Sequence, residues 1–207
     1  PWALTPQYAQ HLAQRAEDAA LGYSPLITNS EGASVDSSEG HFVLAKSRGF
    51  MGGYPYSRHA IGVSPIAGSG DQMQRDYWYS AARDARRLQS PEAIGLEAAR
   101  RTTQRLGAKR IKTGQYPVLY DASLAVGLLG AFVQAASGGA LYRRNSFLVD
   151  ALGQPIFASH VCVDEDPFVL GGMGSAPFDN EGVRTAARRV VHNGQLEGYF
   201  LSSYTAK

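Results

Sequence analysis

The feature that most constrains this chain is a stretch of 21 residues without charge, from Ala122 to Tyr142. Its continuous apolar and glycine run covers only Leu124 to Val133, before Gln134 and the Gly138-Gly139 pair interrupt it. A run of about ten to fourteen apolar residues is typical of a helix buried in a protein core, whereas a membrane-spanning helix needs about twenty. The sequence therefore predicts a long apolar core helix and no membrane span.

The composition predicts a folded domain without a dedicated polyanion partner. Of the 207 residues, 44% are hydrophobic, which is enough for a packed core and excludes a disordered chain. Lys and Arg number 20 against 18 Asp and Glu, a balance that does not suit a nucleic-acid or membrane-surface binder. The single cysteine, Cys162, excludes a disulfide framework and fits a reducing compartment. We expect one domain over residues 1–207, taken from the interior of a longer chain because it opens on Pro1 instead of Met.

The first half of the sequence predicts a helix followed by an antiparallel sheet. Thr5 and Pro6 are suited to cap and open a helix, and Gly22 stands where a left-handed residue would end it. Beyond Gly22, turn residues separate short β-prone runs, which is typical of an antiparallel meander. The expected strands are Leu26–Thr28, Phe42–Lys46, His59–Ile66 and Gln72–Tyr79, with turns at Glu31-Gly32, Gly52-Gly53 and Gly68–Asp71.

The second half mixes helices with short strands. Ser90 and Pro91 should begin a helix that Gly107 ends, and Asp121 should cap the apolar helix, which runs to Ser137. The other expected elements are strands at Pro117–Tyr120 and Ile156–Val163, some helix in Leu141–Ala151, and a hairpin of Val183–Val191 and Gln195–Leu201 around Asn193-Gly194. Because strands and helices are grouped instead of alternating, the predicted class is α+β, with antiparallel meander sheets and packed helices.

No histidine spacing in the sequence matches a zinc motif. The histidines are His11, His41, His59, His160 and His192, and no two lie three to five residues apart. One alternative is a strand that places His160, Cys162, Asp164 and Asp166 on one face, where two of them could share an ion with ligands from elsewhere. Since that stretch offers two ligands at most, we favour a half-buried strand that ends in an acidic turn.

Motifs for nucleophiles and phosphates are also absent. The Gly172–Pro177 segment runs into proline instead of a helix, so it is neither a nucleophile elbow, a dinucleotide fingerprint nor a phosphate loop. On a strand, the Cys162 thiol would point past the His160 imidazole, which argues against a Cys–His nucleophile. A basic cluster between Arg100 and Lys112 could bind phosphates, but without interleaved aromatic residues it better fits a solvated helix face or a protein contact.

Six ordered strings of sequence carry a resemblance to a known family. They are Ile27-Thr28-Asn29-Ser30-Glu31-Gly32, Tyr56-Ser57-Arg58-His59, Met73-Gln74-Arg75-Asp76-Tyr77, Ser137-Gly138-Gly139-Ala140-Leu141-Tyr142-Arg143, Ser175-Ala176-Pro177-Phe178-Asp179-Asn180-Glu181-Gly182-Val183 and Leu201-Ser202-Ser203-Tyr204. One such string would be weak, but six in order over nearly the whole chain are specific. On these strings the chain resembles the TldE (PmbA) branch of the TldD/TldE metalloprotease family.

The resemblance implies a cytoplasmic peptidase of two subunits, in which the TldD-type chain carries zinc on an H-E-x-x-x-H helix. The equivalent helix here, Ser123–Ser137, contains neither His nor Glu. Imidazole and carboxylate groups are what hold the ion and activate its water. We therefore expect this chain to bind no metal or other cofactor, to have no catalytic residue, and to serve as the non-catalytic partner of the TldD-type subunit.

The resemblance also implies a peptide substrate, which we expect to bind backbone to backbone at a sheet edge. Association with the TldD-type subunit, or self-association, should use a largely apolar surface. The alternative function is a regulatory protein that acts on DNA gyrase or another partner, and a third is an enzyme with an unrecognised site. No role is assigned to the residues of the family motifs, which include Arg75, Asp76, Gly138, Gly139, Tyr142, Arg143, Pro177, Phe178, Asp179, Glu181 and Gly182.

Overall fold

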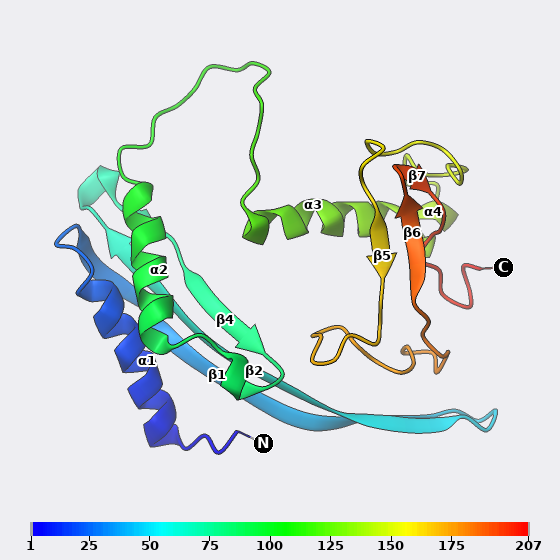
Figure 1. Cartoon of the computed structure of the whole chain (residues 1–207), viewed down its shortest axis with the longest axis horizontal. Coiled ribbons are helices and arrows are strands. Elements are labelled where there is room, and N and C mark those ends of the chain that lie inside the picture. Colours follow the sequence, from blue (N-terminus) through cyan, green and yellow to red (C-terminus); the bar gives the residue numbers. More distant parts are fainter. Residues whose placement is uncertain (1, 207) are drawn as a thin grey trace. The chain divides into compact units, whose positions relative to one another are not determined.

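The computed structural model describes residues 2–206, and these fall into two compact units (Figure 1). Unit 1 runs to Lys112 and includes Leu170–Met173, whereas unit 2 comprises Thr113–Val169 and the residues from Gly174 onward. Each unit has a hydrophobic core of its own. Where the sequence led us to expect one domain over residues 1–207, the chain divides close to Lys112.

Two long antiparallel strands, β1 (Ile27–Ala45) and β2 (Met51–Ala67), form most of the sheet of unit 1. The short strands β3 (Gln74–Arg75) and β4 (Trp78–Ala82) both pair with β2. The antiparallel arrangement predicted from the sequence is therefore confirmed. In this order of strands β1 lies at an edge of the sheet, and β2 is the strand that all the others contact.

Two of the three turns expected in this sheet are wrong. Gly32, with φ of +112°, lies at a β-bulge inside β1, where the register with β2 shifts. Gly52-Gly53 lies inside β2, and the chain instead reverses around Gly49, whose φ of +92° favours a residue without a Cβ atom. The third expected turn, at Gly68–Asp71, is confirmed, and the short 3₁₀ helix η1 (Gly70–Gln72) begins within it.

Two helices, α1 (Pro6–Leu21) and α2 (Pro91–Gln104), pack against each other and against the sheet of unit 1 (Figure 1). Both helix starts predicted from the sequence are confirmed, because the side chains of Thr5 and Ser90 accept hydrogen bonds from backbone N–H groups of the first turn. The expected left-handed end of α1 is wrong, since Gly22 has φ of −74°.

The core of unit 1 is centred on the contact of these helices with the strands. Ile94 of α2 is fully buried among residues that include Ile61 and Val63 of β2. The helices approach closely at Gly95, where a Cβ atom would lie 2.2 Å from the backbone oxygen of Ala16. A side chain larger than hydrogen at this point would force the two helices apart.

Residues 107–120 connect the last helix of unit 1 to the first helix of unit 2 and form neither helix nor strand. The segment is exposed throughout, and Leu119 is 98% exposed. The buried strand expected at Pro117–Tyr120 is therefore wrong. A strand needs a neighbour for its backbone groups, and none of the strands in the described chain pairs with this segment.

Unit 2 combines helices α3 (Ala122–Ala135) and α4 (Gly138–Tyr142) with a small antiparallel sheet of β5 (Val163–Glu165), β6 (Arg188–His192) and β7 (Gln195–Leu196). The hairpin predicted around Asn193-Gly194 is confirmed, and both residues have positive φ, as a tight hairpin turn requires. The strand expected at Ile156–Val163 is wrong, because β5 begins only at Val163. The largest fully buried side chains of this unit are Leu148, Val190, Val191 and Leu196.

α3 is not the long core helix that the sequence predicts. Phe132 is its one buried residue, at 6% exposure, whereas Leu128, Leu129 and Val133 are 52%, 46% and 37% exposed. α3 joins the core of unit 2 near its C-terminal end. Its apolar sequence therefore does not tell which of its side chains are buried. Within residues 2–206, no helix is both long enough and apolar enough to cross a membrane.

Candidate functional site

The helix that the family resemblance identifies with the metal helix is α3, and its side chains do not suit a metal. Asp121 accepts a hydrogen bond from the backbone N–H of Ser123 at 2.9 Å and so acts as the N-cap. From Ala122 to Ala135 the helix contains no His, Cys, Asp or Glu. The part of the chain that the structure describes has no group of three or more such side chains placed to hold an ion. A zinc site needs at least three protein ligands, so these residues do not fit the ion.

The turn after α3 is held by the C-terminal part of unit 2. Gly138 N donates to Phe200 O at 2.7 Å, and Phe200 N donates to Ala136 O at 3.0 Å. A Cβ atom on Gly138 would lie 2.1 Å from Thr205 Oγ1, so the turn has no room for a larger residue. The motif string that contains Gly138 therefore packs against the last motif string of the chain.

Two motif carboxylates hold backbone groups in unit 2. Asp179 Oδ1 accepts hydrogen bonds from Glu181 N at 2.8 Å and from Val183 N at 2.9 Å. Glu181 Oε2 accepts a hydrogen bond from Ser203 N at 2.8 Å. Asp179 thus shapes its own loop, and Glu181 ties that loop to the C-terminal segment. In this structure both residues act as structural acceptors.

The other motif residues of unit 2 have packing or backbone roles. Tyr142 lies edge-on to Tyr204, with ring centroids 5.7 Å apart, and Gly182 has φ of +75°, which disfavours any residue with a Cβ atom. The remaining contacts are a β-bridge between Phe178 and Arg184, a hydrogen bond from Thr185 N to Pro177 O, and the Arg143 guanidinium beside Gly139. Tyr142 thus contacts the C-terminal segment, whereas the other contacts join residues that are close in sequence.

In unit 1, the motif residues Arg75 and Asp76 form ion pairs with other elements. Arg75 pairs with Glu31. Asp76 Oδ2 lies 3.7 Å from Arg101 Nε and 3.7 Å from Arg105 Nη1. The Arg101 and Asp76 side chains are both largely buried, so Arg101 packs on the sheet. Arg105, at 55% exposure, is solvated, as the sequence led us to expect for the cluster.

The structure does not bring His160 and Cys162 together on a strand, because both precede β5. Cys162 is exposed, and its Sγ lies 3.9 Å from Nδ1 of His192, which follows from the position of β6 beside β5. No third ligand completes a site there among the described residues. The alternative of a shared metal face on this strand therefore has no geometric support.

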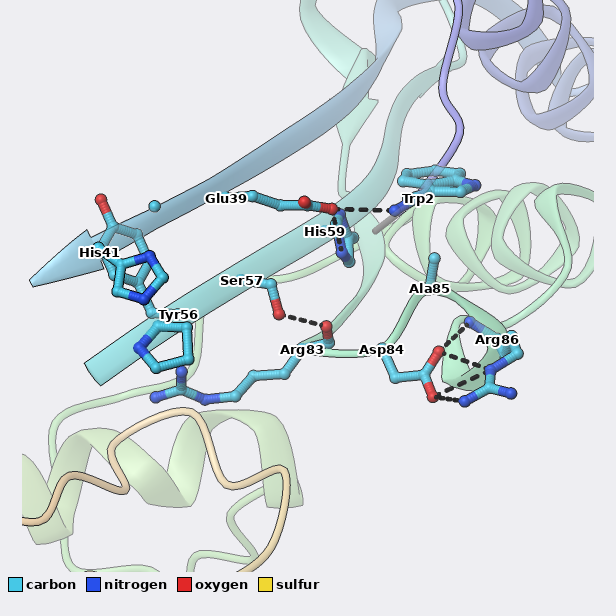
Figure 2. Close-up of a pocket in the computed structure, with 12 residues that line it drawn as sticks. Trp2, Glu39, His41, Tyr56, Ser57, His59, Arg83, Asp84, Ala85 and Arg86 are labelled. Atoms are coloured by element: carbon cyan, nitrogen blue, oxygen red, sulfur yellow. Dashed lines mark hydrogen bonds and ion pairs between the residues drawn. The ribbon is translucent and has the colours of Figure 1, made fainter.

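Unit 1 contains a cavity of about 890 Å³ beside the hairpin of β1 and β2 (Figure 2). Its walls come from both strands, from the segment after β4 that includes the 3₁₀ helix η2 (Ala85–Arg87), and from Trp2. Hydrogen bonds from Arg86 lower the pKa of Asp84 to about 2. At neutral pH these two lining residues form an ion pair that adds no net charge to the cavity wall.

The most buried polar side chain of the cavity wall is His59, at 2% exposure. Its Nδ1 lies 2.9 Å from Ser37 Oγ, and its Nε2 lies 3.9 Å from Glu39 Oε1, which also accepts a hydrogen bond from Trp2 N at 2.9 Å. Figure 2 shows Glu39, His59 and Trp2 converging on one another. A carboxylate 3.9 Å away does not form the hydrogen bond that would orient an imidazole as a catalytic base.

In the sequence, His59 belongs to a motif string, but Ser37 and Glu39 lie some twenty residues before it. The link is the strand register, in which Ser37 is paired with His59. That register depends on where the chain reverses, and the sequence suggests Gly52-Gly53 instead of Gly49. With the turn at Gly49, the antiparallel register places Ser37 directly opposite His59.

This α+β architecture is that of a metallopeptidase family. Residues 1–106 match the profile described as PmbA/TldA metallopeptidase central domain, and residues 113–207 match that of the PmbA/TldA metallopeptidase C-terminal domain. The second profile begins at Thr113, where unit 2 begins, and the first ends six residues before that boundary. The chain therefore belongs to the family of PmbA and TldD metallopeptidases.

Within this family the chain is similar to PmbA itself. It is 41% identical to the metalloprotease PmbA of Escherichia coli O157:H7 over 207 residues, which is all of this chain and 46% of that protein. It is 39% identical over 199 residues to the PmbA homolog of Haemophilus influenzae, covering 96% of this chain and 44% of the homolog. The chain thus spans just under half the length of these curated relatives.

Solved structures share the fold. A candidate modulator of DNA gyrase from Bacteroides thetaiotaomicron matches with a TM-score of 0.92 and 28% identity, over 99% of this chain and 46% of that one. TldE from Thermococcus kodakarensis matches with a TM-score of 0.70 and 18% identity, over 100% of this chain and 48% of that one. At that identity the likeness to TldE concerns the fold alone.

Proposed function

We propose that this chain is part of a non-catalytic, PmbA/TldE-like subunit of a two-chain zinc metalloprotease, in which a TldD-type partner supplies the metal. The observation that carries the proposal is the absence of any metal-binding or proton-transferring side chain on α3. A metallopeptidase needs ligands for its ion and a base for its water. A family member without them can serve the reaction by holding the partner or the substrate.

The exposed apolar residues of α3 support a holding role. Leu124 and Val126 are 59% and 68% exposed, in addition to the half-exposed leucines at the centre of the helix. Apolar surface of this extent, on a helix without charges, is typical of a protein or peptide contact. The substrates we propose are short or unfolded peptides, and the compartment is the cytoplasm, which suits an exposed free cysteine.

A peptidase assay with the full-length protein tests this proposal. The protein, a TldD-type chain, and the two together are each incubated with an unstructured peptide, and the products are followed by mass spectrometry. We expect no cleavage by this protein alone and cleavage by the pair. The control is a TldD-type chain whose zinc-helix glutamate is replaced by glutamine, which should be inactive in the pair. Cleavage by this protein alone, or the lack of any association with TldD-type chains, would contradict the proposal.

Metal content is an independent test. After dialysis, elemental analysis of the full-length protein should give well below one zinc per chain, whereas the TldD-type chain should retain about one. A stoichiometric zinc on this protein would contradict the proposal. A double variant, His160→Ala with Cys162→Ala, would then show whether those two residues hold the ion.

A regulatory role is the second candidate, because solved structures of this fold are described as candidate modulators of DNA gyrase. Regulation through DNA would give binding that weakens steeply as salt is raised. Association with a TldD-type chain through apolar surface would weaken far less steeply with salt. Binding measured against both partners over a range of salt concentrations separates the two functions.

A further inference from the structure

The hairpin of β1 and β2 extends well beyond the rest of unit 1 (Figure 1). Pairing of β4 with β2 reaches only to His59, while the pairing of β1 with β2 continues from Ser38–Arg58 to Ala45–Met51. We call residues 38–58 the hairpin arm. Its root forms one wall of the cavity described above, and its tip is the turn around Gly49.

The hairpin arm has no core of its own. The strand residues in or against the core of unit 1, such as Ile61, Val63 and Val35, all lie outside residues 38–58. An isolated two-stranded hairpin is only marginally stable in water, and three strands or a packed helix are needed for independent stability. A paired arm of this length is therefore expected to gain stability from a surface that covers it.

Both faces of the hairpin arm carry apolar side chains, since directly paired residues point to the same side. On one face, Val43 and Met51 are 66% and 81% exposed. On the other, the rings of Phe42 and Tyr54 pack with centroids 5.4 Å apart, and the Tyr56 ring lies over Gly40. Aromatic residues and methionine are enriched at protein interfaces.

Beyond its root, the charged residues of the hairpin arm are all positive. No Asp or Glu occurs from Gly40 to Gly70, whereas Lys46, Arg48 and Arg58 lie in this part of the sequence. Two of these cations flank the tip. A surface that receives the arm should therefore offer an apolar groove with acidic residues at its far end, because opposite potentials steer association and fix its register.

We propose that the hairpin arm inserts into an acid-rimmed apolar groove on the second protein chain of the assembly, an inference that rests on the proposed function. A second copy of this chain is disfavoured as the occupant, because two cationic tips brought together repel each other. Nucleic acid is disfavoured because the arm has few cations and the whole chain is close to neutral.

Two variants of the full-length protein test the hairpin arm. Val43→Thr with Met51→Thr removes the apolar contact while keeping residues that suit a strand. Lys46→Glu with Arg48→Glu reverses the charge of the tip. We expect the first variant to weaken binding to the TldD-type chain at least tenfold, mainly by faster dissociation. The second should slow association at least fivefold at low salt, and this effect should diminish at high salt.

The matched control is Lys109→Glu with Arg110→Glu, which makes the same change of charge in the exposed connecting segment. It should bind like the wild type, and circular dichroism should show that all variants are folded. Variants of the arm that bind like the wild type would overturn this proposal and leave the proposed function standing. A wild-type protein that binds no TldD-type chain would overturn both. Variants that lose duplex DNA binding or self-association, with unchanged binding to the TldD-type chain, would assign the arm to those partners instead.

Discussion

At the scale of single residues, apolar side chains of α3 differ widely in their burial. Phe132 packs edge-on to Phe157 and Phe200, with ring centroids 5.2 Å and 6.4 Å away, and is almost completely buried. Leu128, one helical turn earlier, is about half exposed. The same helix thus contributes to the core of unit 2 at one end and offers apolar surface along the rest of its length.

This difference predicts unequal costs of truncation. Phe132→Ala should lower the free energy of unfolding by about 3–5 kcal/mol, because it empties the centre of an aromatic cluster. Leu128→Ala should cost less than about 1 kcal/mol, because half of that side chain is already in water. Chemical denaturation monitored by circular dichroism measures both. Similar costs for the two variants would show that the burial of α3 differs from this description.

A second residue-scale prediction concerns the ion pair between α1 and α2. The hydrogen bond from Arg15, at 2.6 Å, lowers the pKa of Glu92. A carboxyl group with a lowered pKa in the folded state contributes stability above its unfolded pKa and loses it as the pH falls through the folded value. An NMR titration should give Glu92 a pKa below its ordinary range, and Arg15→Gln should raise that pKa toward the ordinary value. An unshifted Glu92 in the wild type would contradict this.

At the scale of elements, local turn chemistry determines some connections more strictly than others. Gly194 has φ of +81°, and a Cβ atom there would lie 2.3 Å from the backbone oxygen of Phe157. Gly153 has a similar φ of +76° but no atom within 4 Å of a Cβ position. Backbone strain is therefore common to both positions, and steric conflict exists at only one.

Alanine substitutions separate these two effects. Gly153→Ala should cost about 1–2 kcal/mol, which is the penalty for a left-handed residue with a Cβ atom. Gly194→Ala should cost distinctly more, because Phe157 must also move and the β6–β7 hairpin with it. Thermal unfolding of both variants provides the comparison. Equal costs would mean that the hairpin adapts freely at Gly194.

The sequence predicts those elements whose determinants are local. Helix starts at Thr5, Ser90 and Asp121 and the Asn193-Gly194 turn all depend on groups within a few residues, and all are confirmed. The turn at Gly49 and the burial of α3 depend on partners distant in sequence, so local patterns misplace them. The same reason explains why the cavity around His59 is not predicted while the family motifs, which are strings of neighbours, are recognised.

At the scale of the whole molecule, each unit has its own core and a long exposed segment connects them. This predicts that brief treatment with trypsin cuts first at Lys109, Arg110 or Lys112 and leaves two large fragments. Mass spectrometry of the early products would identify the sites. First cuts inside α1, α2 or β6 would show that these elements open to the protease more readily than the connecting segment.

The contact of Gly138 with Phe200 has a consequence for the order in which the chain acquires its structure. The strands of unit 1 pair with neighbours in sequence, so they can form as soon as about the first half of the chain exists. Unit 2 must wait until Phe200 has been synthesised, because the turn after α3 is hydrogen-bonded to that residue some sixty positions later in the sequence. Long-range closure of this kind is slow, and synthesis proceeds from the N-terminus. Phe132, the residue of α3 that packs against Phe200, therefore stays exposed to water until that later segment has been synthesised, and a chaperone that binds the nascent chain would cover it there.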